Sequence, residues 1–352
     1  MEKRKTIVDV AAAAQVSTGT VHRALYGKPG VSEEMRKKIL KIAWEMGYQP
    51  NQIASSLKKK PLRIIVAFPN PMEDNRFFYG EVWEGYREFR KEMQFYNCEI
   101  IEAPYDYDGI NDFATNIKGI LRQYQGKVDG IISGGKMLEA DIDIANRLHE
   151  SGIPLVLVSE NVEKMEYLCS VQSDHETDGK MAAELLMAQI PDGSQILVVA
   201  GDVLLTSNRQ NMSGFKSFIE QSGRNHPLIK IYGYESFDGV QERILDVLNN
   251  NPDVKGMYSV SARGTLFLAR AVDSLGLKGT IRVIGSDIYP ESVRYLKEGV
   301  IHFIIDKSPR KQVQVGLNRL MSYLVQRKEP LVKDEYLTSI IVCGSNVDKY
   351  IT

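Results

Sequence analysis

The sequence has few of the features that mark secreted, membrane-spanning or disulfide-bonded proteins. Only three of its 352 residues are cysteines, at positions 98, 169 and 343. This odd number at wide spacing argues against a disulfide framework or a cysteine zinc site, and fits a reducing compartment. No apolar run approaches the roughly 18 residues that span a bilayer, and the first residues lack the apolar segment of a secretory signal. We therefore expect a cytoplasmic protein with no membrane contact.

Catalytic and metal-binding motifs are missing as well. The chain contains no G-x-x-x-x-G-K-[ST], no G-x-G-x-x-G and no G-x-S-x-G. Its five histidines show no metal-ligand spacing, and neither His22 nor His175 has an evident catalytic partner. The sequence thus predicts a protein that is not an enzyme and that uses no cofactor and no metal.

Charge is unevenly distributed along a chain of otherwise ordinary globular composition. Residues 1–60 hold 12 Lys and Arg against 5 Asp and Glu, a net charge of +7. The other 292 residues hold 32 against 40, a net charge of −8. A basic N-terminal part indicates an anionic partner such as nucleic acid. The alternative is a basic surface that is only solvated.

Residues 1–48 have the spacing of three short helices joined by a tight turn. Hydroxyl residues that can cap helices stand at Thr6, Ser17 and Ser32. A second helix from Thr18 to about Leu25 would present its first residues to the major groove, as in a helix-turn-helix unit. A generic three-helix bundle is the alternative. The candidate DNA contacts are Thr6, Ser17, Thr18, Gly19, Thr20, His22 and Arg23.

The segment 49–61 reads as a hinge between this all-α head and the rest of the chain. Asn51 can cap a short helix, 52–59, which Pro61 must end. A helix of that length is not stable alone in water, so a partner has to order it.

The order T-x-x-D-V-A-x-x-A-x-V-S-x-x-T-V-x-R, which begins at Thr6, is specific. Together with Y-Q-P-N from position 48, it resembles the DNA-binding head of the lactose-repressor (LacI/GalR) family. The resemblance implies that two hinge helices pair in the minor groove of double-stranded DNA. Leu57 would be the residue that wedges between base pairs, and Ala54 the position of close approach. An ordinary linker leucine is the alternative for Leu57.

From residue 62 onward, short apolar runs alternate with amphipathic helical stretches. This alternation predicts an α/β core of two doubly wound parallel-sheet subdomains with a ligand cleft between them. The expected strands are 63–68, 98–103, 128–133, 154–159, 195–200, 228–234, 254–260, 281–286 and 300–305. The expected helices are 78–95, 138–151, 177–189, 207–223, 238–250, 264–275 and 309–327.

The same remainder, 62–352, resembles the periplasmic-sugar-binding-protein-like core of that repressor family. Its marks are weaker, for example V-Q-S-D-H-E-T-D-G-K-M-A-A from position 171 and T-S-N-R-Q-N-M-S-G-F from position 206. The resemblance implies that the chain crosses between the subdomains three times, which we expect near 160–163, 287–291 and 324–330. The N-subdomain would then comprise 62–161 and 290–325, and the C-subdomain 162–289 and 326–352.

Ligands of such sheets bind beyond the carboxyl ends of the strands, so residues just after the strands are the effector candidates. Arg209 can bond hydroxyls or a carboxylate, Asp287 can accept from two hydroxyls, and Glu160 follows a strand directly. Phe77, Phe78 and Tyr79 offer flat apolar faces for a sugar ring. For each residue, a plain loop or core role is the alternative.

Two positions depart from what the family commonly carries. Ser261-Ala262, followed by Arg263, stands where an Asn-Asp pair is usual, and Lys307 stands where related sugar binders often have Gln. These cations suggest an acidic or phosphorylated sugar as effector. The alternative is that both pair with local acids, Lys307 with Asp306 or Glu298.

The sequence therefore predicts a sequence-specific DNA-binding transcriptional regulator, most simply a repressor, controlled by a small sugar-like effector. A single helix-turn-helix reads only a half-site, so we expect a homodimer on a pseudo-palindromic operator. The alternative is a small-molecule sensing module of the periplasmic-binding-protein type that does not act on DNA.

Overall fold

A computed structural model describes residues 7–25, 29–46, 60–72, 75–93, 96–106, 112–233 and 237–351, apart from four side chains (7, 22, 237 and 238). Residues 1–61 and 95–97 form one compact unit, and the rest of the chain forms another. In the described part, no helix combines the length and the hydropathy that a bilayer crossing needs.

The first unit contains the three predicted helices, α1 (Ile7–Ala14), α2 (Thr18–Leu25) and α3 (Glu33–Glu45). Ser32 caps α3, since its hydroxyl accepts from the backbone N–H of Met35 at 3.3 Å. The helices bury one small apolar core, which explains why their apolar residues recur every three or four positions. The core residues are Val10, Ala11, Ala14, Val21, Ala24, Ile39 and Ala43.

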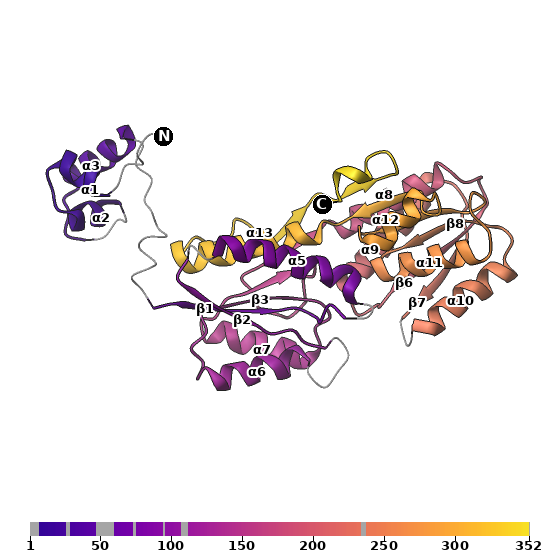
Figure 1. The fold of residues 1–352 in the computed structure, drawn as a ribbon, viewed down its shortest axis with the longest axis horizontal. Coiled ribbons are helices and arrows are strands. Elements are labelled where there is room, and N and C mark those ends of the chain that lie inside the picture. The colour runs from indigo at the N-terminus through magenta and orange to yellow at the C-terminus, as the bar shows by residue number, and fades with distance from the viewer. Residues whose placement is uncertain are drawn as a thin grey trace. The chain divides into compact units, whose positions relative to one another are not determined.

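The second unit consists of two lobes, each built on a six-stranded sheet (Figure 1). The N-lobe sheet is entirely parallel and has the order β11-β5-β4-β3-β1-β2. The C-lobe sheet has the order β12-β10-β9-β8-β6-β7, and only β12 is antiparallel to its neighbour. The N-lobe strands are β1 (Leu62–Ala67), β2 (Cys98–Glu102), β3 (Gly130–Gly134), β4 (Leu155–Val158), β5 (Cys169–Ser173) and β11 (Asp334–Leu337). The C-lobe strands are β6 (Gln195–Gly201), β7 (Leu228–Tyr232), β8 (Val254–Ser259), β9 (Arg282–Ser286), β10 (Phe303–Asp306) and β12 (Ile340–Val342).

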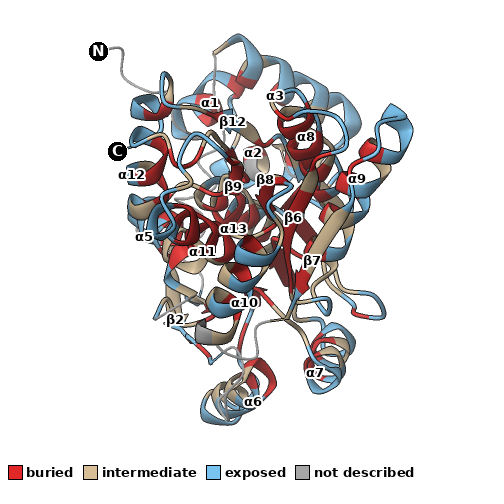
Figure 2. Ribbon diagram, turned by 90° about the vertical axis from the view of Figure 1, so that its right-hand side faces the viewer, coloured by how far each residue is buried: buried red, intermediate tan, exposed pale blue. Residues whose placement is uncertain are grey.

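Helices cover both faces of each sheet, and the buried strands are visible between them in Figure 2. In the N-lobe, α5 (Arg76–Met93) and α13 (Pro309–Gln326) lie on one face, and α6 (Phe113–Gln123) and α7 (Glu139–Glu150) on the other. In the C-lobe, α8 (His175–Met187) and α9 (Thr206–Ser222) lie opposite α10 (Phe237–Asn250), α11 (Ala262–Ser274) and α12 (Pro290–Lys297). Strand β6 is apolar from Ile196 to Ala200 because Ile196 and Val198 pack under α8 and α9, while Leu197 and Val199 pack under α10 and α11.

The strand pairing corrects the predicted lobe boundaries at all three crossings. The first crossing follows β5, since Cys169–Ser173 pairs with β4 in the N-lobe sheet. The second follows β10, which pairs with β9 in the C-lobe, and the third falls between β11 and β12. Each crossing therefore lies some way beyond its predicted position, near 160–163, 287–291 and 324–330. At the first and third crossings the reason is that β5, β11 and β12 are short or half polar, so no continuous apolar run reveals them. At the second crossing the strand was expected at 300–305 but assigned to the N-subdomain, and only its pairing with β9 places it in the C-lobe.

Candidate functional site

Helix α2 presents a polar surface in the head. Ser17, Thr18, Gly19 and Arg23 are exposed, whereas Thr20 is half-buried and its hydroxyl bonds that of Ser17 at 2.9 Å. The side chains predicted to meet DNA therefore lie on the outer face of α2, and Val21 and Ala24 hold its inner face in the core. The remaining DNA candidates lie outside the described residues: Thr6, Asn51, Ala54, Leu57 and the side chain of His22.

The core encloses a cavity of about 360 Å³ that residues of both lobes line. It lies where strands β3, β4, β6, β8 and β9 end and where helices α5, α8, α9 and α11 begin. Seven of the eight predicted effector residues line it: Phe77, Phe78, Tyr79, Glu160, Arg263, Asp287 and Lys307. Phe77 reaches across from the N-lobe and is buried against Tyr289 of the C-lobe, with ring centroids 4.8 Å apart.

Arg209 is the predicted effector residue that does not line the cavity. Its guanidinium donates to the carbonyl oxygens of Val203 and Leu204, at 2.8 and 3.0 Å, and to the hydroxyl of Thr206 at 3.0 Å. The exposed side chain thus holds the loop before α9, and Arg209, which was expected to bond the effector, does not line the cavity. The spacing places Arg209 in the first turn of α9, but the helix phase turns it away from the cavity.

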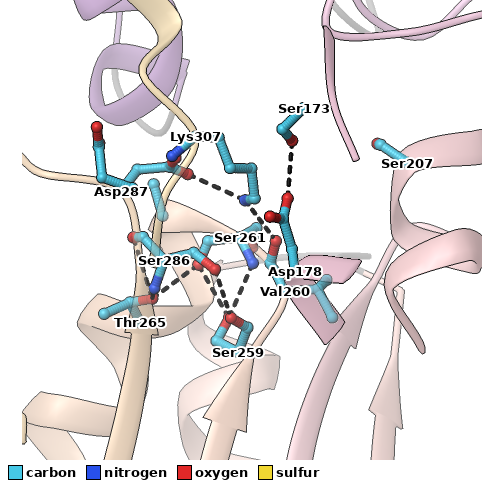
Figure 3. Close-up of polar contacts among 12 residues, drawn as sticks. Ser173, Asp178, Ser207, Ser259, Val260, Ser261, Thr265, Ser286, Asp287 and Lys307 are labelled. Carbon is cyan, nitrogen blue, oxygen red and sulfur yellow. Dashed lines mark hydrogen bonds and ion pairs between the residues drawn. The ribbon is translucent and has the colours of Figure 1, made fainter. Parts of the chain in front are cut away.

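Asp287 and Lys307, predicted as separate ligand contacts, form a buried ion pair with each other (Figure 3). The ammonium of Lys307 lies 3.2 Å from Asp287 Oδ2 and donates to the carbonyl of Val260 at 3.0 Å. Asp287 is held in the left-handed region, with φ of 63°, at the end of β9. Such a conformation is uncommon outside glycine and concentrates at functional sites. Lys307 therefore pairs with Asp287, and not with Asp306 or Glu298, which were the alternative partners considered for it.

Glu160 is a buried carboxyl that joins the two lobes. It follows β4 in the N-lobe and accepts from the backbone N–H of Ser207 at 3.2 Å and from the Ser207 hydroxyl, both at the beginning of α9 in the C-lobe. Burial raises the pKa of Glu160 to about 7, although these two hydrogen bonds and the positive charge of Arg209 lower it in part. Its charge therefore changes near neutral pH.

A histidine that the sequence pattern left without a role also lines the cavity. His175 is buried, with Nδ1 3.0 Å from the hydroxyl of Ser173 and Nε2 3.1 Å from the carbonyl of Ser159. The Ser173 hydroxyl donates to Asp178 at 2.7 Å (Figure 3). Burial, with the charge of Lys307, lowers the pKa of His175 to about 4, so the imidazole is neutral at physiological pH.

Sequence reasoning missed several further lining residues. Lys136, after β3, forms an ion pair of 3.1 Å with Asp202, after β6, and so bridges the two lobes. Asn208 and Asn211 reach the cavity from α9. Position just after a strand could have indicated Lys136 and Asp202, but nothing local distinguishes Asn211 from a surface asparagine. The other lining residues that were not predicted are Asn75, Ser159, His175, Leu205, Ser207, Val260, Ser261 and Ala262.

The head and the core of the chain each match a known protein family. The family described as bacterial regulatory proteins, lacI family, matches residues 6–51, and the family described as periplasmic binding protein domain matches residues 66–328. Catabolite control protein A of Priestia megaterium is 29% identical over 249 residues, which cover 68% of this chain and 70% of the relative. The sucrose operon repressor of Streptococcus mutans serotype c is 26% identical over 315 residues, covering 85% and 90%.

Solved structures with the same fold come from regulators and from transport proteins. A putative LacI transcriptional regulator from Bacteroides fragilis superimposes with a TM-score of 0.72 at 20% identity, covering 83% of this chain and 100% of that one. A solute-binding protein of an ABC transporter from Burkholderia graminis C4D1M, in complex with D-arabinose, gives a TM-score of 0.73 at 17% identity, covering 83% and 99%. At these identities the likeness concerns the fold.

Proposed function

This chain belongs to the LacI family of bacterial regulatory proteins, and on that premise we propose that it is a cytoplasmic, homodimeric repressor that binds a pseudo-palindromic operator and responds to a sugar-like effector. The observation that carries the proposal is the presence, in one chain, of a head with an exposed polar helix and a core with a ligand-sized cavity. The operon repressors among its relatives support the class of effector.

The head supplies the contacts to DNA. Arg23 is exposed on α2, beside the exposed Thr18 and Gly19. A guanidinium there can fork onto the edge of a guanine, and small hydroxyl residues can contact phosphate. The hinge would add minor-groove contacts through Leu57, as the resemblance implies.

The cavity is the site through which an effector would control DNA binding. Its walls belong to two lobes that are joined by Glu160 with Ser207 and by Lys136 with Asp202, so a ligand bound between them favours one arrangement of the lobes. An effector changes operator affinity only by as much as it prefers one core arrangement over the other.

The experiment is operator binding by full-length wild-type protein and the Arg23→Ala variant, measured by gel shift on a selected site and on a scrambled one. If Arg23 reads a base, the variant loses about 1–3 kcal/mol on the selected site only. If it contacts phosphate, both affinities fall together. Unchanged binding to both sites would refute the role of α2, and Lys118→Ala, at an exposed position of α6 in the core, is the control.

A further inference from the structure

A residue of the cavity wall carries a hydrogen-bond donor that no described part of the protein satisfies. Asn211, in α9, is 1% exposed and lines the cavity. Its Oδ1 accepts from the hydroxyl of Tyr258 at 2.7 Å, which fixes the orientation of the amide, and its Nδ2 has no partner within the described residues. A buried donor without an acceptor is costly, so a group that enters the cavity and offers an oxygen is favoured there.

The carboxylates of the cavity, by contrast, are already engaged. Asp287 is paired with Lys307, Asp202 with Lys136, and Glu160 accepts two hydrogen bonds from Ser207. A cationic ligand would have to displace one of these protein partners. The acidic side of the cavity therefore offers little for a cation.

Lys307, a cation of the cavity wall, still has an N–H donor available for a ligand. The ammonium of Lys307 carries three N–H donors and uses two of them, on Val260 and Asp287, among the residues described. In Figure 3 this ammonium lies above the turn that connects β8 with α11. Helix α11 begins at Ala262 on the cavity wall, has no acidic residue in its first turn and has Arg263 there instead. The amino end of a helix favours negative charge.

We propose that the effector of this regulator carries an anionic oxygen group, a carboxylate or a phosphate, which accepts from Asn211 Nδ2 and Lys307 Nζ at the amino end of α11. Asp287 and Glu160 then accept from hydroxyls of the same molecule, and Phe78 and Tyr79 line the cavity on the N-lobe side. The proposal rests on the proposed function, because it names the effector class of that same cavity.

The test is calorimetry and thermal shift on the full chain with matched sets of ligands. The sets are D-glucose, D-glucuronate and D-glucose 6-phosphate, then D-galactose with D-galacturonate, and D-ribose with D-ribose 5-phosphate. We expect at least one acidic member to bind about tenfold or more tightly than its neutral partner, since a charge-assisted hydrogen bond contributes at least that much. The sugar acids and the sugar phosphates distinguish the two sources of the anionic group.

Variants at position 211 locate the anionic group. Asn211→Asp keeps the acceptor for Tyr258 but replaces the donor with a negative charge, so binding of the acidic ligand should fall by about tenfold or more. Asn211→Ala, which adds no charge, should reduce it by a smaller factor. Asn250→Asp adds the same charge at the exposed end of α10 and is the matched control.

Two results would overturn the proposal: neutral sugars that bind as tightly as their acids, or a complete panel in which no acidic member binds. Unchanged acid binding by a folded Asn211→Asp variant would also contradict it. Operator binding by the same preparations separates this failure from failure of the proposed function. Protein that binds its operator but prefers neutral sugars remains a regulator with a different effector class.

Discussion

Some residues of the cavity have more than one role, and Glu160 is the clearest example. Its carboxyl lies at the end of a buried strand, where water is excluded, and its hydrogen bonds come from the opposite lobe. Desolvation disfavours the charged form more than these bonds favour it, which is why the pKa rises to about 7. The same side chain thus joins the lobes, lines the effector cavity and titrates near neutral pH.

Replacing Glu160 with Gln should change how stability depends on pH. The ordinary pKa of 4.5 applies in the unfolded chain and about 7 in the folded one, so the folded state holds a proton that the unfolded state has released. Stability of the wild type therefore falls as pH rises from about 4.5 to about 7, and Glu160→Gln removes that dependence. The difference in free energy of unfolding between the two proteins should change by about 3 kcal/mol between pH 4.5 and 8.

Urea denaturation of both proteins at several pH values measures this difference. Burial raises the pKa of Asp306 to about 6. This residue titrates in both proteins, so its contribution cancels from the difference in their free energies of unfolding. A stability difference that stays constant across the pH range would show that Glu160 is already ionised when folded in mildly acidic solution.

At the scale of elements, the packing of α8 against α9 positions the residues of these two helices that line the cavity. Gly179 lies so close to α9 that a Cβ atom there would be 1.9 Å from the carbonyl oxygen of Asn211. Gly214 stands in the same relation to the carbonyl oxygen of Glu176 on α8. These two glycines let the backbones of α8 and α9 come into contact. This contact fixes the position of Asn211 relative to the cavity.

Gly179→Ala should destabilise the core by about 1–3 kcal/mol, because the added methyl group overlaps backbone that cannot move alone. It should also weaken effector binding, since the carbonyl that must yield belongs to Asn211. Gly119→Ala in α6 is the matched control: a Cβ there meets nothing within 4 Å, so helix propensity should raise stability by about 0.5–1 kcal/mol. Equal stability changes in the two variants, measured by thermal and urea unfolding, would contradict this account.

On the scale of the whole molecule, the contacts between the lobes matter most for control. The ion pair of Lys136 with Asp202 is joined by that of Arg76 with Glu291, at 3.2 Å, and by Phe77 against Tyr289. All three reach from the N-lobe to the C-lobe. The relative stability of lobe arrangements therefore depends on a few polar and aromatic contacts that surround or adjoin the cavity.

Lys136→Met should weaken this joint while leaving each lobe intact. The Lys136 and Asp202 side chains are 16% and 24% exposed, so the pair is only partly screened by water. We expect effector affinity to fall about fivefold, equivalent to about 1 kcal/mol, and the radius of gyration of the free protein to increase in small-angle scattering. The exchanged pair, Lys136→Asp with Asp202→Lys, should recover part of the affinity. No change in either measurement would mean that the ion pair does not hold the lobes.

Much of this arrangement could be predicted from the sequence, because helices, strands and caps depend on neighbours along the chain. The three head helices and the nine apolar strands are confirmed, and they follow from local spacing and from apolar runs. Several residues just after the strands line the cavity, since parallel strands end at a common edge. Position after a strand indicated Asp287 and Glu160, whereas Lys307 was indicated by its departure from the family's usual Gln.

Tertiary structure alone decided which side chains meet. Helix phase turns Arg209 outward, and only the docking of β10 beside β9 brings Lys307 to Asp287. Sheet membership of β5 likewise depends on pairing with β4 and β11, the latter more than 160 residues away, and its own residues alternate polar and apolar. Local pattern determined the elements, the basic head and the family, because these are properties of short segments. The partner of each buried polar group was decided by the packing of distant segments, on which no short stretch of sequence carries information.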